Sequence, residues 1–426
     1  MKMKKSAFAG VAVALALALS ACSGGGSPQA SGGGTAAPAS NVTITFMSNV
    51  VGAQADALGT IAKAFTAQTG IKVDYSSPGA DYETLMTTKM ASGDMPDVFT
   101  THGWSVQRYA SFLQPVNDQP FFSKITPQIK PVITDANGNV YVLPVDADIA
   151  GLVYNVDVLQ KAGVDPSTLT TWAKFTAALG TIKKSGVTPL HVGGKDSWTI
   201  GQYGDYIAPS FFITNDTSNQ RDALTGGTFD AQTWDQVAGL MDSWVKAGYF
   251  NTDSMTADYN ADASAIAQGK SAFGFYGNSF IVDAQKVNPK ANLGMMPIPA
   301  ATDADQPSLI AGEKLAVGVW KDSPHKDAAM QFLNFLAQDD NVATLAKASG
   351  NPAGLTGVNP DLGTIQTYLD KYSNVRTFPY FDRVYLPNGM WDIMCSTGAA
   401  ILQQSPNAVT NAGQTMQKNF KTMFQG

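Results

Sequence analysis

Aromatic and acidic side chains recur in this sequence at positions outside regular apolar helix or strand patterns. An aromatic ring can stack on the apolar face of a ligand, and a carboxylate accepts strong hydrogen bonds from hydroxyl groups. Together they suit a ligand with C–H faces and a hydroxyl rim, although the same set also suits a cation. The candidate ligand-binding residues are Asp81, Tyr82, His102, Trp104, Asp146, Asp148, Trp198, Asn278, Glu313 and Trp391.

No motif for covalent, phosphate or metal chemistry accompanies these residues. The sequence has no Gly-x-Ser-x-Gly elbow, no His-Glu-x-x-His and no glycine-rich phosphate loop ending in Lys and Ser or Thr. The three histidines are too far apart for local metal-ligand spacing. Glycoside hydrolysis needs only two carboxylates, and the 34 acidic residues leave that alternative open without singling out a pair. We expect no catalytic residue, metal or cofactor.

Composition and charge exclude two classes of protein. The chain has 426 residues, of which 44% are hydrophobic and 10% aromatic, enough to build a large core and to exclude general disorder. Its 28 Lys and Arg against 34 Asp and Glu give a net charge of −6. Because a nucleic-acid binder needs a concentrated cationic stripe, and no basic cluster occurs beyond the first five residues, we expect no nucleic-acid partner.

The N-terminus has the pattern of an export signal. A basic start precedes an apolar run over residues 7–19, which is short for a permanent membrane span but typical of a signal peptide. Residues 19–22 read Leu-Ser-Ala-Cys, which resembles a bacterial lipobox, so we expect lipidation at Cys22 after removal of residues 1–21. The alternative is an ordinary cleaved signal. The uncharged, Gly- and Ser-rich residues 22–40 then form a flexible tether.

The folded body begins near Asn41 with alternating strand and helix patterns. The expected elements are strands over 42–47, 71–75 and 96–100 and helices over 55–69 and 81–92. This alternation predicts a parallel sheet covered by helices. Ligands of such sheets bind beyond the carboxyl ends of the strands. The loops concerned are 48–54, 76–82 and 101–107.

The pattern continues in the middle of the chain. Further expected elements are strands over 140–144 and 149–154 and helices over 156–162 and 170–186, the last capped by Thr170. Trp198 falls in a glycine-rich segment that we expect to be a loop. The tryptophans with helical spacing, which we expect in the core, are Trp172, Trp234 and Trp244.

Residues 137–163, NGNVYVLPVDADIAGLVYNVDVLQKAG, resemble the solute-binding proteins of carbohydrate ABC importers, the group that includes maltose-binding protein. Further segments agree in order and spacing, although Pro166 lies further from its helix than usual. These segments are 92–98, 169–172, 268–273, 277, 296–299 and 323–336. The resemblance covers nearly the whole body, from Asn41 to about Phe420.

The resemblance implies an α/β fold of two lobes, each a mostly parallel sheet flanked by helices. The lobes are joined by a hinge of several chain crossings and close on a ligand. The expected N-terminal lobe comprises 41–148 plus 314–350, and the C-terminal lobe 149–311 plus 355–426. The expected crossings lie near Ile149, Gly312 and Gly354.

The resemblance also implies a function without chemistry. The protein would capture a mono- or oligosaccharide between its lobes and deliver it to the transmembrane subunits of an ABC permease. It would act as a monomer outside the cytoplasm, anchored to the cell membrane through Cys22. A cationic or peptide-like ligand such as a polyamine is the alternative, because aromatic rings and carboxylates would serve it too.

Several candidates correspond to ligand positions of this family. Trp391 follows a Pro-Asn-Gly turn and matches an aromatic residue that stacks on the sugar; the alternative is a core anchor. Asp148 matches an acidic ligand residue by its spacing from Tyr154, and Asp146 would point to the same side of an extended chain. Trp104, like its neighbour His102, follows the third strand, where the family places ligand-contacting residues. A solvated charge near the hinge is the alternative for the two aspartates.

Overall fold

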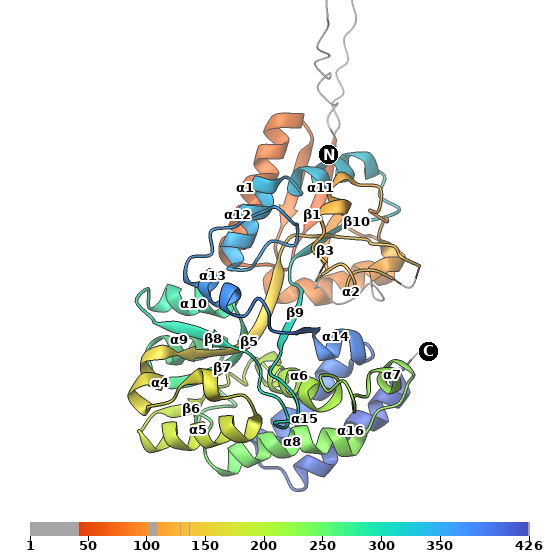
Figure 1. Ribbon diagram of the computed structural model, residues 1–426. Helices are drawn as coiled ribbons and strands as arrows, with labels where there is room; N and C mark the ends of the chain where they lie inside the picture. The colour runs from red at the N-terminus through yellow and green to blue at the C-terminus, as the bar shows by residue number, and fades with distance from the viewer. Residues whose placement is uncertain (1–41, 102–108, 128, 136, 425–426) are drawn as a thin grey trace, which may run out of the picture. The chain divides into compact units, whose positions relative to one another are not determined.

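The computed structural model describes residues 42–424 except 102–108, 128 and 136, with helices flanking two β-sheets (Figure 1). The predicted lipidation site Cys22 and the candidates His102 and Trp104 therefore lie outside the described residues. Within the described ranges, no helix is both long and apolar enough to cross a membrane.

The first sheet has five strands and contains the parallel unit that the sequence predicts. Their order across the sheet is β2 (Lys72–Ser76), β1 (Thr43–Met47), β3 (Val98–Thr101), β10 (Ala316–Val319) and β4 (Leu143–Pro144). Strand β1 is parallel to β2 and β3, but β10 is antiparallel to β3 and β4. The flanking helices are α1 (Gly52–Thr69), α2 (Tyr82–Ser92), α11 (Lys326–Leu336) and α12 (Asp339–Ser349).

The second sheet is built around one long strand, β5 (Ala147–Asn155). The order is β11 (Thr377–Pro379), β9 (Leu309–Glu313), β5, β7 (Ser271–Gly277) and β6 (Thr188–Leu190), and β8 (Leu293–Met296) also pairs with β5. All three neighbours of β5 are antiparallel to it. The α/β class with helix-flanked sheets is confirmed. In the first sheet only β10 runs opposite to the other strands, and in the second only β5 does, so each sheet is mostly parallel with one reversed strand.

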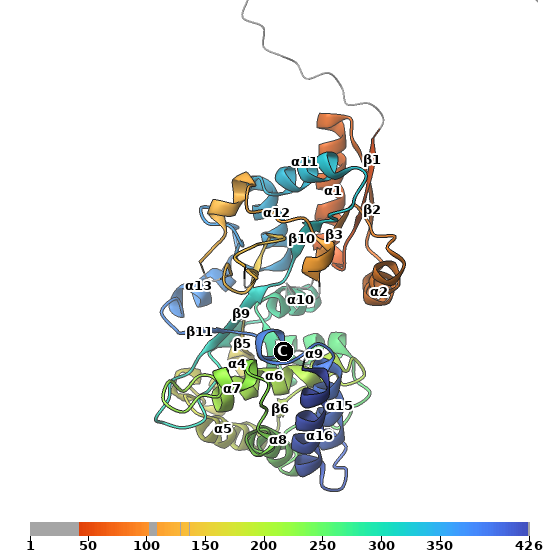
Figure 2. The ribbon, with the colours of Figure 1, turned by 90° about the vertical axis from the view of Figure 1, so that its right-hand side faces the viewer.

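Most helices belong to the second sheet (Figure 2). They are α4 (Val156–Ala162), α5 (Trp172–Lys184), α6 (Trp198–Phe212), α7 (Arg221–Thr225), α8 (Ala231–Lys246), α9 (Tyr259–Ala267), α10 (Ser279–Val287), α13 (Thr364–Lys371), α14 (Phe381–Tyr385), α15 (Met390–Leu402) and α16 (Ala408–Met423). Their apolar sides form a core rich in aromatic rings. The expected core tryptophans Trp172, Trp234 and Trp244 are confirmed, with 2%, 3% and 0% of their surface exposed.

Three local expectations are corrected. The cap of α5 is Thr171 and not Thr170, because the Thr171 hydroxyl accepts the Lys174 N–H while its backbone stays extended. Trp198 is the first residue of α6 and not part of a loop. The strand expected over 140–144 shrinks to β4, a two-residue strand at the sheet edge.

The chain passes between the sheets where β5 begins at Ala147 and where β9 ends at Glu313. A third passage follows α12, since Leu355 packs in the core of the first sheet and Ile365 packs beside the second. The described residues, with both sheets, belong to one compact unit of the chain. The lobe boundaries given above therefore stay a prediction.

One buried carboxylate forms hydrogen bonds with the segments at these passages. Asp146, between β4 and β5, has no exposed surface. Its Oδ2 accepts hydrogen bonds from Gln54 Nε2 (2.9 Å), Ser349 Oγ (2.7 Å) and Asn351 Nδ2 (3.2 Å), and its Oδ1 accepts one from Leu315 N (2.8 Å). Burial raises the pKa of this carboxyl, and the hydrogen bonds oppose the shift. Asp146 thus joins α1, α12 and the link from β9 to β10.

We predict that Asp146→Ala destabilises the protein strongly, because four buried donors lose their acceptor. A loss of about 3 kcal/mol or more in the free energy of unfolding is expected from urea denaturation. Asp94→Ala is the control: the Asp94 side chain is 85% exposed and pairs with Lys89 only at 3.4 Å, so the change should stay within about 0.5 kcal/mol. Equal effects of the two variants would contradict the role given to Asp146.

Candidate functional site

Four buried acceptor oxygens without a hydrogen-bond partner among the described residues lie on the elements around the start of β5. They are Asp148 Oδ1, Gln202 Oε1, Asp205 Oδ2 and Glu313 Oε2. Leaving such oxygens unpaired is costly in a folded protein, so each of them has capacity for a hydrogen bond from outside the chain. We call this set the open acceptors.

Asp148 lies in a space made by glycines on both neighbouring strands. Its Oδ2 accepts a hydrogen bond from the Tyr380 hydroxyl at 2.5 Å. A Cβ atom at Gly277 would overlap the Asp148 carboxylate. On the other side Gly312 pairs with Asp148 in the sheet, and a Cβ atom there would lie 2.7 Å from Arg383 Nη1. The two glycines therefore admit the carboxylate, the phenol and the guanidinium.

Arg383 on α14 is the cation of this site. Its guanidinium lies 3.9 Å from the centroid of the Tyr380 ring, and Nη1 donates to the Glu313 carbonyl oxygen at 3.1 Å. Burial alone would lower the pKa of Arg383, but the acidic groups of Tyr380, Asp382 and Glu313 raise it above its ordinary value. The side chain therefore carries a full positive charge among several acids.

Glu313 is the last residue of β9 and is 3% exposed. Its side chain lines a small cavity together with Thr101 and Tyr141, which belong to the region of the first sheet. Burial raises the pKa of Glu313 to about 8, and the neighbouring Arg383 charge opposes that shift. The carboxyl group therefore holds its proton at neutral pH in the structure described.

Helix α6 carries the other two open acceptors on one face. Gln202 and Asp205 are three residues apart, so their side chains project from the same side of the helix. The Asp205 Oδ1 atom accepts the Asp382 N–H at 2.9 Å. Burial raises the pKa of Asp205, and the neighbouring Asp382 charge adds to that shift. Burial also raises the pKa of Asp382, and the Arg383 charge opposes the shift.

Two indoles lie beside the beginning of α6. Trp198 opens the helix and is 36% exposed. Trp391 is the second residue of α15 and is half-buried. A Cβ atom at Gly201, one turn into α6, would lie 3.0 Å from the Trp391 ring. The structure thus brings both predicted tryptophans next to the helix that carries Gln202 and Asp205.

Asp148, Glu313, Trp198 and Trp391 are the sequence-predicted residues that the structure brings to these elements. Asp146 is enclosed as described above, with both oxygens paired. Asn278 also has no exposed surface. Its Oδ1 accepts the N–H of residue 149 at 3.1 Å and its amide donates to the carbonyl of residue 350. These two side chains serve the passages between the sheets.

Tyr82 and Asp81 lie in the region of the first sheet. Tyr82 is 1% exposed and its hydroxyl donates to the Thr100 carbonyl oxygen. Asp81 is exposed and precedes α2. Ligand binding by any of the ten candidates stays a prediction.

Sequence reasoning did not select Gln202, Asp205, Tyr380 or Arg383 as candidates. None of these residues lies in a recognisable motif. The signal that could have found them is the helical spacing of Gln202 and Asp205 behind Trp198, which puts two polar groups on one turn of an otherwise apolar helix.

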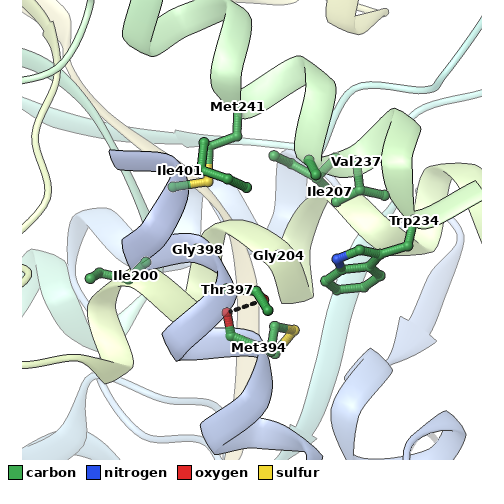
Figure 3. A pocket seen from close by; sticks show the side chains of 11 residues that line it. Ile200, Gly204, Ile207, Trp234, Val237, Met241, Met394, Thr397, Gly398 and Ile401 are labelled. Carbon is green, nitrogen blue, oxygen red and sulfur yellow. Dashed lines mark hydrogen bonds between the residues drawn. The ribbon is translucent and has the colours of Figure 1, made fainter. Parts of the chain in front are cut away.

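A separate cavity of about 20 Å³ lies between α6, α8 and α15 (Figure 3). Its lining side chains are apolar except Thr397, whose hydroxyl donates to the Met394 carbonyl oxygen at 3.1 Å. A space of this size holds a single water molecule at most. Among the described residues, no group of three or more His, Cys, Asp or Glu is placed to hold a metal ion.

The fold is that of a two-lobed binding protein. Residues 24–343 match the family model for the bacterial extracellular solute-binding protein. The chain is 33% identical over 361 residues to the melibiose/raffinose/stachyose-binding protein MelE of Bacillus subtilis (strain 168), covering 84% of each sequence. The chain belongs to the bacterial extracellular solute-binding protein family.

Solved structures of similar proteins have the same fold. The structure of a sugar transporter from Bacillus licheniformis in complex with stachyose is similar, with a TM-score of 0.82, 35% identity, and coverage of 90% of this chain and 100% of that chain. A binding protein from Bacillus subtilis in an open conformation also has a TM-score of 0.82, at 31% identity, covering 90% and 98%. The family resemblance in the sequence is confirmed, and so is the expectation of a binding protein and not an enzyme.

We predict that Glu313 makes the protein less stable as pH rises. Its pKa of about 8 in the folded chain lies above the ordinary 4.5, so ionisation between these values costs free energy. The free energy of unfolding should fall by up to about 1.4 kcal/mol per pH unit from this group and level off above pH 8. Glu313→Gln, which keeps the shape without ionising, should reduce that slope in denaturation curves at pH 5.5 to 8.5. Parallel pH profiles of the two proteins would contradict the assignment.

Proposed function

We propose that this protein is the sugar-binding component of an ABC importer, capturing a mono- or oligosaccharide by closure of two lobes. The observation that carries the proposal is the set of open acceptors beside Trp198 and Trp391. Sugar hydroxyls donate hydrogen bonds to oxygens such as those of Asp148 and Gln202, and they accept one from a protonated carboxyl such as that of Glu313. The C–H faces of a sugar ring stack on indoles.

The protonation of the site favours a neutral ligand. A polyamine would need ionised carboxylates, and the site does contain four carboxyl groups around the Arg383 cation. Burial, however, raises the pKa of Glu313 to about 8 and raises the pKa of Asp205 above its ordinary value, so the charged form of both groups is disfavoured. With Arg383 present, the site has little excess negative charge to attract a cation. A cationic ligand remains the second candidate and is an arm of the test below.

The relatives suggest which sugar to try first. A relative that is 33% identical is named for binding melibiose, raffinose and stachyose, and a structure that is 35% identical holds stachyose. We propose that this chain takes an oligosaccharide of the same series. Two indoles near one face of α6 would suit a ligand of more than one ring.

Delivery would follow from anchoring and closure. We propose that residues 1–21 are removed, that lipid on Cys22 holds the protein at the outer face of the cell membrane, and that 22–40 form the tether. The monomeric protein would close when a ligand contacts both lobes, because only the closed form makes all the contacts. The closed form would then dock on the transmembrane permease subunits.

The ligand class is tested by calorimetric titration of the soluble protein beginning at Ser23. One panel contains melibiose, raffinose, stachyose and maltose, and the other contains spermidine, putrescine and short peptides. Saturable binding of a raffinose-series sugar at micromolar concentration is the expected result. A response to a polyamine together with silence towards every sugar would overturn the sugar assignment and keep the transport role.

We predict that Trp391→Ala and Trp198→Ala each weaken sugar binding at least about tenfold, corresponding to about 1.4 kcal/mol of lost stacking. Trp391→Phe is the matched control, since it keeps an aromatic face and should lose less than about threefold. Melting temperatures are measured in parallel without sugar. A steep fall in melting temperature with unchanged affinity would mean that the indole is a core anchor.

A further inference from the structure

Another buried carboxylate, which is not one of the open acceptors, lies near Trp198. Asp262 in α9 has no exposed surface. Its Oδ1 atom is 2.5 Å from His191 Nδ1, and its Oδ2 atom accepts hydrogen bonds from Gly193 N (2.9 Å) and from the Tyr276 hydroxyl. Both oxygens are therefore used by groups from other segments of the chain.

The Tyr276 ring supports Trp198. It stacks on Phe280 with the ring centroids 4.3 Å apart and the planes 1° from parallel. The Trp198 ring meets it at 6.1 Å and 70°, and meets the Tyr259 ring at 5.0 Å. Edge-to-face contacts of this kind fix the orientation of a ring. The Trp198 indole therefore packs against the Tyr276 and Tyr259 rings, while 36% of the Trp198 surface stays exposed.

The same carboxylate also holds the backbone that leads into Trp198. Gly193, whose N–H binds Asp262, starts the short segment before α6, and its carbonyl oxygen accepts the Asp196 N–H at 2.9 Å. Cβ atoms at Gly193 and Gly194 would overlap the backbone of residues 254 and 258. This segment is therefore packed too closely to move independently of its hydrogen bonds.

Helix capping does not account for Asp262. The N-cap of α9 is Asp258, whose side chain already accepts the Ala261 N–H at 3.0 Å. An apolar residue at 262 would fill the core without the cost of burying a carboxyl group. What the carboxylate adds is a hydrogen-bonded connection between the Gly193 segment and the Tyr276 ring, which are two of the supports of Trp198 beside the Tyr259 ring.

We propose that Asp262 is a positioning residue that fixes the Trp198 indole for ligand stacking, acting through Tyr276 and Gly193. The inference rests on the proposed sugar-binding function for the role of Trp198. It assigns Asp262 no contact with the ligand. An indole fixed before binding loses less conformational freedom when a sugar ring stacks on it, so the support increases affinity.

Tyr276→Phe tests the hydrogen bond between Tyr276 and Asp262 with little risk to folding. The substitution keeps the ring and removes only the hydroxyl that binds Asp262. We expect sugar affinity to fall about three- to tenfold in the otherwise unchanged protein. In the Trp198→Ala background the same substitution should change affinity less than about 1.5-fold, because the group it acts through is gone. Equal losses in both backgrounds, or no loss in either, would overturn the proposal.

Tyr203→Phe is the matched control. The Tyr203 hydroxyl is equally buried and donates to the His191 carbonyl oxygen at 2.9 Å, but the Tyr203 ring packs on Phe275. This variant should bind sugar as the unchanged protein does. A loss as large as that of Tyr276→Phe would show that any buried hydroxyl in this core matters equally, and would overturn the specific role of Asp262.

A readout without ligand separates this inference from the proposed function. With 5-fluorotryptophan incorporated, the Trp198 resonance is identified by its absence in Trp198→Phe. Tyr276→Phe should shift or broaden that ¹⁹F resonance, and Tyr203→Phe should leave it in place. An unmoved resonance in Tyr276→Phe overturns the positioning role even if sugar binds. Failure of every sugar to bind the unchanged protein overturns the proposed function, while the resonance still decides the positioning role.

Discussion

The Asp148 carboxylate lies over a glycine of β7, is hydrogen-bonded by Tyr380 on one oxygen only, and is 9% exposed. A buried carboxyl group with an unpaired oxygen is unfavourable unless something supplies a donor. The residues around Asp148 satisfy this constraint in part. The glycines at 277 and 312 leave room for the carboxylate, Tyr380 donates a hydrogen bond to it, and the positive charge of Arg383 balances the negative charge of the neighbouring acids. A ligand that brings hydroxyl groups would complete the hydrogen bonding.

Two kinds of buried carboxylate can be told apart by their hydrogen bonding. Asp146 and Asp262 have both oxygens paired within the chain, the first at the passages between the sheets and the second behind Trp198. Asp148 and Glu313 each keep an oxygen without a partner among the described residues. The first kind stabilises the scaffold and positions other residues, and the second kind is available to a ligand. Burial and charge alone would not separate them.

Much of the scaffold follows from local patterns in the sequence. The first β-α-β-α-β unit and the helix over 156–162 were predictable because period-two and helical apolar spacings are short-range signals. The directions of β5, β9 and β10 were not, since a strand sequence does not say whether its neighbour runs parallel or antiparallel. Family resemblance supplied the two-lobed class, which the comparisons confirm.

The site was less predictable, for a physical reason. Asp146 and Asp148 are two residues apart and looked equivalent, but Asp146 meets α1 and α12 while Asp148 meets Tyr380, and these partners come from distant parts of the chain. Arg383 gave no local signal because its surroundings exist only after folding. The aromatic candidates were easier, since an indole that follows a glycine-rich segment or a Pro-Asn-Gly turn is visible in the sequence.

The central claim is that the unpaired oxygens beside α6 and β5 receive sugar hydroxyls. A crystal structure of the protein with raffinose tests it most directly. The account predicts sugar hydroxyl oxygens within about 3.2 Å of Asp148 Oδ1 and Gln202 Oε1, with a sugar ring against Trp391 or Trp198. A raffinose molecule bound away from these residues, with waters in their place, would contradict it.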